Sequence, residues 1–275
     1  MTIRIEEALR EAQQVLDRID AEILLAHVLD CSRTHLRTWP EREVSPEPLS
    51  NFQQLVVRRA AGEPIAYLTG TREFWDMTLR VTPDTLIPRP ETERLVELAL
   101  ERIPANTAWR IADLGAGSGA IALALARERP KSHVIATDVS PAALAVARDN
   151  AARLNVTNIE FRLGRWFAPL EGERFHLIAS NPPYVHPADL HLAEGDLRFE
   201  PPTALASSPD GLADIREIIT GAHDHLHPGG WLLLEHGYDQ GRAVETLLRE
   251  EGYQAVEVVT DLGHRERVGI GRWGG

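Results

Sequence analysis

A glycine-rich stretch over residues 113–120, Asp-Leu-Gly-Ala-Gly-Ser-Gly-Ala, is the first feature of this sequence that could do chemistry. It lies where a short apolar strand is predicted to give way to a helix. Glycines in such a turn can adopt positive φ and bring bare backbone N–H groups against a ligand. The stretch therefore predicts a cofactor-binding loop, formed by Gly115, Ala116, Gly117, Ser118 and Gly119.

Asp138 ends the next predicted strand, 23 residues after Gly115, which is about the spacing at which a carboxylate reaches the hydroxyl pair of a ribose. The glycine loop also satisfies the dinucleotide pattern G-x-G-x-x-G/A. Loop and carboxylate together fit either a nicotinamide cofactor or S-adenosyl-L-methionine. On these residues alone both cofactors stay open.

The tetrad Asn181-Pro182-Pro183-Tyr184 follows an apolar strand predicted over residues 177–180. Pro182 keeps Asn181 out of helical geometry, and two consecutive prolines remove two backbone donors. The side-chain oxygen of Asn181 and the carbonyl of Pro182 can then each accept one hydrogen from a planar –NH₂ group, while Tyr184 stacks on its π-face. The tetrad predicts a binding and catalytic site for the amino group of an amide or an aromatic base.

The elements that must position these motifs alternate between strand and helix after Pro90. This alternation predicts an α/β, Rossmann-like fold with a mostly parallel seven-stranded sheet, helices on both faces, and the ligand at the carboxyl ends of the strands. Strands are predicted at 111–114, 133–137, 159–163, 177–180, 231–235, 255–260 and 267–272, and helices at 120–129, 141–154, 212–225 and 241–251.

Residues 1–70 differ from the rest of the chain, since their apolar positions recur every three to four residues, as in a bundle of three or four short helices. Alternating residues over 71–88 predict a β-hairpin or linker. We therefore expect a small helical domain at 1–70 and the α/β domain at 89–275.

Charge and cysteine usage narrow the class of protein. Lys and Arg number 29 against 41 Asp and Glu, a net charge of −12, which argues against stable nucleic-acid binding. The single cysteine, Cys31, cannot form an internal disulfide, and the chain has no signal-like or membrane-spanning apolar run. We expect a cytoplasmic protein that does not bind membranes. No metal is expected, because His223, His225 and His227 are predicted to end a helix, where cationic groups favour the dipole.

Further stretches of the chain, taken in order, are similar to the HemK/PrmC family of class I methyltransferases, which methylate the glutamine of peptide chain release factors. With the glycine loop and the tetrad, this similarity covers the sequence from about residue 60 to the end, and residues 165 and 236 depart from it. The stretches that carry it are Gly62-Glu-Pro-Ile-Ala-Tyr-Leu-Thr-Gly70, Leu86-Ile-Pro-Arg-Pro-Glu-Thr-Glu93, Arg198-Phe-Glu-Pro201, Asp210-Gly-Leu212 and Asp261-Leu-Gly-His-Arg265.

The resemblance implies S-adenosyl-L-methionine as cofactor, with the glycines lining its methionine part, Asp138 its ribose and Trp166 its adenine. It implies that residues 181–184 take the substrate glutamine and that domain 1–70 docks the release factor during methylation. The alternatives left open are a glutamine methyltransferase for a ribosomal protein and a DNA adenine-N6 methyltransferase, which shares the tetrad. A nicotinamide dehydrogenase would leave the tetrad unexplained, and a binding-only protein with an inactive cofactor site is the weakest reading.

Overall fold

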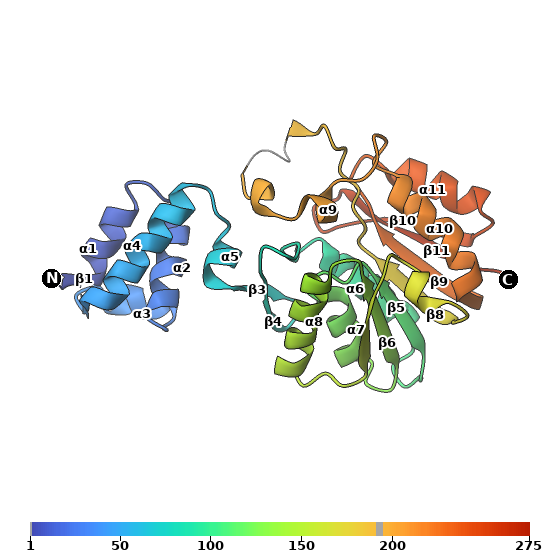
Figure 1. The fold of residues 1–275 in the computed structure, drawn as a ribbon, viewed down its shortest axis with the longest axis horizontal. Coiled ribbons are helices and arrows are strands. Elements are labelled where there is room, and N and C mark those ends of the chain that lie inside the picture. Colours follow the sequence, from blue (N-terminus) through green and yellow to red (C-terminus); the bar gives the residue numbers. More distant parts are fainter. Residues whose placement is uncertain (1, 191–194) are drawn as a thin grey trace. The chain divides into compact units, whose positions relative to one another are not determined.

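The structure is a computed structural model that describes residues 2–190 and 195–275. The chain divides into two compact units (Figure 1). The smaller unit comprises residues 2–71 together with 195–199, and the larger comprises 72–190 and 200–275. Among the described residues, no helix is both long and apolar enough to cross a bilayer.

The smaller unit is a helical bundle with one short strand pair that the periodicity did not reveal. Side-chain caps at Asp17 and Ser32 begin two of its helices, and Pro46 occupies the first turn of a third, a position where its missing N–H costs nothing. Its elements are β1 (Ile3–Arg4), α1 (Ile5–Ala12), α2 (Arg18–Val28), α3 (Arg33–Thr38), β2 (Glu43–Val44), α4 (Pro46–Ala60) and α5 (Ile65–Thr69).

Residues 195–199 belong to the smaller unit although they lie far along the chain. Arg59 joins them to α2, because its guanidinium contacts Asp196 at 2.7 Å and Asp20 at 2.6 Å. Arg198 donates a hydrogen bond to the carbonyl of Ala61. Ion pairs and hydrogen bonds therefore hold this segment in the smaller unit, and no local sequence pattern predicts them.

The larger unit begins with the predicted hairpin, β3 (Thr71–Phe74) and β4 (Met77–Arg80), followed by α6 (Thr92–Arg102). Its seven-stranded sheet has the order β10-β11-β9-β8-β5-β6-β7, with parallel pairing from β9 to β7 and antiparallel pairing for β11 and β10. The strands are β5 (Arg110–Leu114), β6 (His133–Asp138), β7 (Ile159–Leu163), β8 (Phe175–Ser180), β9 (Leu226–Glu235), β10 (Gln254–Thr260) and β11 (Glu266–Arg272).

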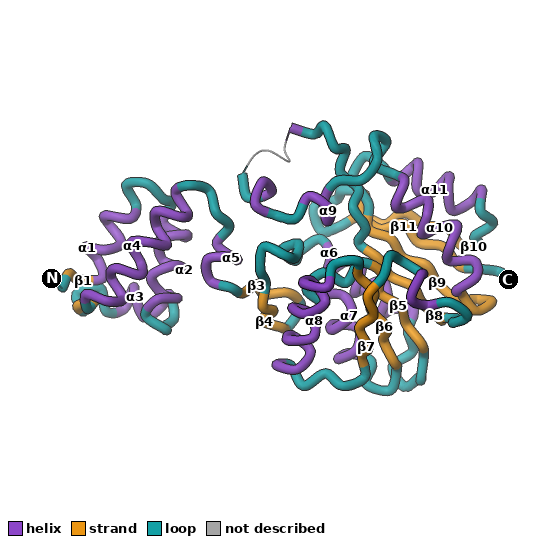
Figure 2. The backbone as a smooth tube through the Cα atoms, in the orientation of Figure 1, coloured by secondary structure: helices purple, strands orange, loops and turns teal. Residues whose placement is uncertain are grey.

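Helices cover both faces of this sheet (Figure 2). One apolar core packs α6, α7 (Ala120–Glu128) and α8 (Pro141–Arg153) against one face, and a second packs α10 (Ala213–His225) and α11 (Gly241–Glu250) against the other. A short helical turn at 168–170 and the helix α9 (Pro202–Leu205) lie in the connecting segments of this unit. The helical turn at 197–199 belongs to the smaller unit. The predicted α/β architecture and all seven predicted strands are confirmed.

The histidine prediction is wrong in one respect. His223 and His225 lie in the last turn of α10, but His227 belongs to β9, which runs through Pro228-Gly-Gly without a break. The three rings pack against other rings: His225 stacks on Phe167, His223 on Trp273, and His227 lies 4.6 Å from His176. Within the described part of the chain, no group of three His, Cys, Asp or Glu side chains could hold a metal ion.

Candidate active site

The two motifs leave the sheet side by side. Leu114 and Ser180 are register partners in the parallel pair β5 and β8, and each is the last residue of its strand. The Ser180 hydroxyl donates a 2.6 Å hydrogen bond to the carbonyl of Leu114. Because β6 and β7 extend the sheet on one side of β5 and β8 extends it on the other, Gly115 and Asn181 start at a topological switch point, where α/β sheets bind ligands.

The glycine loop uses the conformations that only glycine adopts without strain. Gly115, Gly117 and Gly119 have φ values of +81°, +53° and +86°. A Cβ atom on Gly115 would lie 3.3 Å from the ring of Trp166, and one on Gly119 would lie 3.1 Å from Leu123. A side chain at 115 would therefore both strain the loop and press on the aromatic wall of the site.

Asp138 is bonded to the glycine loop through its carboxylate. One oxygen accepts the Gly117 N–H at 2.8 Å, and the other accepts the Ser140 N–H at 2.8 Å. Each carboxylate oxygen has more than one lone pair, so these bonds leave acceptor capacity for a ligand hydroxyl.

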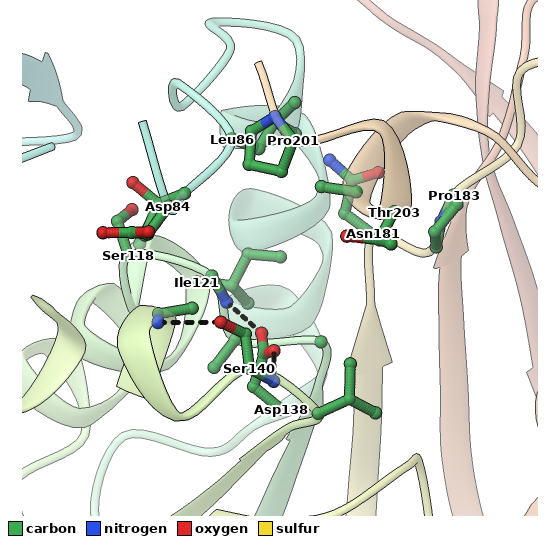
Figure 3. A pocket seen from close by; sticks show the side chains of 18 of the residues that line it. Asp84, Leu86, Ser118, Ile121, Asp138, Ser140, Asn181, Pro183, Pro201 and Thr203 are labelled. Carbon is green, nitrogen blue, oxygen red and sulfur yellow. Dashed lines mark hydrogen bonds between the residues drawn. The ribbon is translucent and has the colours of Figure 1, made fainter. Parts of the chain in front are cut away.

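A cavity of about 500 Å³ lies over this edge of the sheet and has the size of a small-molecule site. Asn181 and Pro183 lie on one side of it, opposite Asp84 and Ser118 (Figure 3). The predicted site residues that line it are Gly115, Ala116, Gly117, Ser118, Asp138, Trp166, Asn181 and Pro183, whereas Gly119, Pro182 and Tyr184 are not among its lining residues.

Trp166 forms one wall of the cavity and is 8% exposed. Its carbonyl accepts the Thr137 hydroxyl at 3.0 Å, and the Arg165 guanidinium lies 5.3 Å from its ring centroid. Arg165 in turn contacts Asp214 at 2.8 Å and Glu217 at 2.6 Å. The arginine that departs from the expected pattern thus packs on the tryptophan while its charge is neutralised.

Glu200, in the stretch 198–201 that carries part of the family similarity, is buried. Its carboxylate accepts the Ile87 N–H at 3.0 Å and forms an ion pair with Arg89. These contacts join the loop that precedes α6 to the segment 201–206. Both segments line the cavity, so Glu200 shapes the cavity without facing it.

The two polar members of the tetrad, Asn181 and Tyr184, each form a hydrogen bond to a side chain of another element. The side-chain amide of Asn181 donates to the Thr92 hydroxyl at 3.2 Å. The Tyr184 hydroxyl donates to Glu235 at 3.1 Å, and burial raises the pKa of Tyr184, so it stays a neutral donor. Gln240 adds a 3.1 Å hydrogen bond to the carbonyl of Tyr184.

Sequence reasoning missed Thr92 and did not connect Glu235 to the site by any contact. The available signals were weak: Thr92 stands in a motif that also reads as ordinary helix-start chemistry, and Glu235 ends a strand. The two lie 89 and 51 residues from their tetrad partners, so no local pattern pairs them.

Electrostatics favour a cationic ligand. Asp84 and Asp138 line the cavity, whereas the third lining aspartate, Asp214, is paired with the lining Arg165, and the other lining arginine, Arg89, is paired with Glu200. A pyrophosphate would meet these carboxylates without a free cation to offset them. The cavity is thus better suited to a positively charged group than to a dinucleotide.

Two family descriptions match separate parts of the chain. The PrmC N-terminal domain matches residues 2–70, and the methyltransferase small domain matches residues 93–195. The first coincides with the helical bundle and the second with the part that carries the glycine loop and the tetrad.

Similar proteins span almost the whole chain. A release factor glutamine methyltransferase of Xylella fastidiosa is 52% identical over 264 residues, which cover 96% of this chain and 96% of that protein. One of Vibrio cholerae is 49% identical over 281 residues, covering 99% and 98%. The crystal structure of a methyltransferase from Pyrococcus furiosus covers 82% of this chain and 99% of its own, with a TM-score of 0.55 at 19% identity, and shows the shared fold.

Proposed function

The chain belongs to the release factor glutamine methyltransferases, and from this premise we propose that it transfers a methyl group from S-adenosyl-L-methionine to the side-chain nitrogen, N5, of the glutamine in the Gly-Gly-Gln motif of peptide chain release factors. The observation that carries the proposal is the joint position of the glycine loop and Asn181 on one cavity. The proposed cofactor site and the proposed acceptor for an amide –NH₂ group would therefore share a single cavity.

The lining residues fit this cofactor. Gly115 has no side chain and so leaves room beside Trp166, which a Cβ atom at position 115 would fill. The indole of Trp166 offers an adenine-sized apolar surface to the cavity. Asp138 would hold the ribose hydroxyls, and the acidic lining suits a ligand that carries a sulfonium and an ammonium group. When bound, S-adenosyl-L-methionine supplies an electrophilic methyl group on that sulfonium.

Catalysis by the chain's own residues is mainly orientation. A glutamine amide nitrogen is a weak nucleophile, because its lone pair is delocalised into the carbonyl. Asn181 Oδ1 and the Pro182 carbonyl would each accept one N–H of the substrate amide and so fix the direction of the nitrogen. Positioning of this kind contributes up to about 7–11 kcal/mol. The amide gives up one proton to solvent after alkylation, so the proposal assigns no general base.

Labelling tests the proposal directly. The protein is incubated with methyl-labelled S-adenosyl-L-methionine and a release factor, and the label is located by peptide mass spectrometry. We expect label on the glutamine of Gly-Gly-Gln and none when that glutamine is replaced by alanine. Parallel incubations replace the release factor by ribosomal protein or by DNA. Label on either of these, with none on the release factor, would reject the proposed substrate.

The cofactor is tested separately by calorimetry with S-adenosyl-L-homocysteine, the demethylated product, and with NAD. We expect heat of binding from the first and no comparable heat from the second, because the carboxylates lining the cavity oppose a pyrophosphate. Binding of NAD alone would overturn the cofactor assignment.

We also propose that the helical unit at the N-terminus docks the release factor. It folds around its own apolar core and exposes Val15, Ile19 and Val57, with 62%, 56% and 69% of each residue accessible to solvent. Contact with a protein substrate would remove such aliphatic side chains from water, which is favourable.

A further inference from the structure

Arg89 is one of the two arginines that line the cavity. Its guanidinium forms an ion pair with Glu200, whose side chain is fully buried and also accepts the Ile87 N–H at 3.0 Å. Within the described part of the chain, the other N–H groups of this guanidinium have no hydrogen-bond partner. A guanidinium carries five N–H donors, so most of the donors of Arg89 remain available to a ligand.

The other arginine of the cavity, Arg165, has its donors engaged. Its guanidinium contacts Asp214 at 2.8 Å and Glu217 at 2.6 Å. It also packs 5.3 Å from the ring centroid of Trp166, the wall proposed for adenine. Arg89 is therefore the lining arginine that has donors to offer.

Arg89 lies close to the residue proposed to hold the substrate amide. Its carbonyl accepts the Thr92 N–H at 3.1 Å where α6 starts. The hydroxyl of Thr92 in turn accepts a hydrogen bond from Asn181 Nδ2 at 3.2 Å. Two hydrogen bonds thus connect Arg89 to Asn181 through Thr92, and the side chains of Arg89 and Asn181 line the same cavity.

The proposed ribose site at Asp138 lies at the opposite end of this cavity. Figure 3 shows Leu86 and Pro201 on the side away from Asp138. These two residues are close in sequence to Arg89 and Glu200, whose ion pair joins their segments. The available donors of Arg89 therefore belong to the end of the cavity that is left for the substrate.

The proposed contacts leave one polar atom of the substrate amide without a partner. The Asn181 and Pro182 oxygens would accept both N–H groups, but the carbonyl oxygen of the same amide needs a donor once it leaves water. A buried acceptor without a donor lowers affinity. Within the tetrad the prolines have no N–H, and the side-chain nitrogen of Asn181 is bonded to Thr92. A donor from another element would satisfy this oxygen.

We propose that Arg89 is a substrate-binding residue that donates a hydrogen bond to the side-chain carbonyl oxygen of the glutamine. Glu200 holds the guanidinium and neutralises its charge, so the remaining N–H groups suit a neutral carbonyl better than the carboxylate of the cofactor. The contact would favour an amide over a simple amine, which has no carbonyl oxygen. The proposal rests on the proposed function, because the substrate amide is the ligand that Arg89 would recognise.

This contact should act on binding more than on the chemical step. Delocalisation in the amide places negative charge on its carbonyl oxygen, and alkylation of the nitrogen withdraws that charge. The hydrogen bond from Arg89 would therefore be stronger in the bound substrate than in the transition state. Its loss should raise KM without lowering kcat.

Arg89→Met tests the proposal, because it removes every side-chain donor and keeps an unbranched stem. We expect KM for the release factor to rise about 10- to 100-fold, the range for a hydrogen bond to a charged group. Both kcat and the dissociation constant of S-adenosyl-L-homocysteine should change less than threefold. Arg94→Met is the matched control, since Arg94 lies in α6, is similarly exposed, pairs with Glu97 and is not among the lining residues.

A second variant separates substrate binding from the structural effect of losing the ion pair. Arg89→Met alone leaves the buried carboxylate of Glu200 without a counter-charge, which can destabilise its segment. Adding Glu200→Gln removes that charge and keeps an acceptor for the Ile87 N–H. If Arg89 contacts the substrate, KM should stay raised in the double variant. Glu200→Gln alone keeps the donors of Arg89 and should raise KM much less than Arg89→Met.

Three outcomes would overturn the proposal. Recovery of KM in the double variant would assign Arg89 a purely structural role. An equal rise in the dissociation constant of S-adenosyl-L-homocysteine would place Arg89 at the cofactor, and a loss confined to kcat would contradict a contact made in the bound substrate. Failure of the proposed function is distinguishable, because the unmodified protein would then place no label on the release factor.

Discussion

The carboxylate of Asp138 accepts the backbone N–H of Gly117 at 2.8 Å. A residue expected to contact the ribose of a cofactor is therefore also the residue that closes the glycine loop. Its second oxygen accepts the Ser140 N–H at the start of α8, so one side chain ties the ends of two strand-to-helix turns together.

Replacing Asp138 with alanine should weaken cofactor binding and loosen the loop at the same time. Hydrogen bonds to a charged group are worth about 1.5–3 kcal/mol each, so we expect the dissociation constant of S-adenosyl-L-homocysteine to rise at least about tenfold. Calorimetry measures the change, with Asp149→Ala as the control, a partly exposed residue of α8 that does not line the cavity. A dissociation constant within threefold of the unmodified value would exclude Asp138 from the cofactor site.

Replacing Asn181 with alanine removes one of the two proposed acceptors for the substrate amide. Deleting one preorganised hydrogen-bond partner typically costs about 10²–10³-fold in turnover. We expect single-turnover methylation of the release factor to slow by this factor while cofactor affinity changes little. Asn106→Ala, in an exposed turn, is the control. Rates within about tenfold of the unmodified protein would mean that the tetrad is only a structural turn.

The stability of the larger unit should depend on the pH through Asp113. Burial raises the pKa of this carboxyl from 3.8 to about 7, although the Ala122 N–H at 3.1 Å lowers it. The folded state then binds the proton more tightly than the unfolded state. The contribution of protonated Asp113 to the free energy of unfolding is complete below about pH 4. It is lost as the pH rises to about 7, at about 1.4 kcal/mol per pH unit.

Asp113→Asn removes this titration and should gain stability over the unmodified protein as the pH rises through the same range. Thermal unfolding at several pH values measures the difference in the free energy of unfolding between Asp113→Asn and the unmodified protein. The contributions of other titrating groups cancel in this difference. A difference between the two proteins that stays constant from pH 5 to pH 8 would contradict the raised pKa of Asp113.

Acid should unfold the helical unit through Glu22, whose carboxylate binds three arginines. Hydrogen bonding from Arg37 lowers the pKa of Glu22 from 4.5 to about 2, with further bonds from Arg18 and Arg33. The folded state therefore favours the ionised form, and this contribution is present above about pH 4.5 and lost as the pH falls toward 2.

Glu22→Gln removes the charge that binds the three arginines and should destabilise the helical unit at neutral pH. We expect a loss of only about 1–3 kcal/mol, because solvent screens the half-exposed arginines. Hydrogen exchange of amides in α2 and α3 measures the loss, and Glu41→Gln in an exposed turn serves as the control. Unchanged exchange rates would show that the ion pairs are energetically neutral.

Removing residues 1–70 should separate docking from chemistry. If the helical unit docks the release factor, the shortened protein should lose far more kcat/KM on the whole factor than on a short peptide that contains Gly-Gly-Gln. Binding of S-adenosyl-L-homocysteine serves as the measure of remaining fold. Equal losses on both substrates would assign the unit a stabilising role only.

The sequence by itself determined the features that depend on neighbouring residues. The helix start at Ser140 and Pro141, the apolar strands and the glycine loop follow from local propensity and spacing, so the α/β architecture was predictable. The predicted bounds of its strands and helices agree to within two residues except at β9, which begins at Leu226 and not at Trp231. The tetrad could also be identified from the sequence, because two consecutive prolines restrict the local backbone and remove two N–H donors.

Only the tertiary structure decided which of these features meet. The pairing of Leu114 with Ser180 depends on the strand order, and that order brings Asn181 to the glycine loop. Thr92 and Glu235 reach the tetrad from α6 and β9, across separations that no periodic pattern encodes. Contacts between distant segments are selected by the burial and hydrogen bonding of the whole fold. For this reason the contacts of Thr92 and Glu235 with the tetrad could be identified only in the structure.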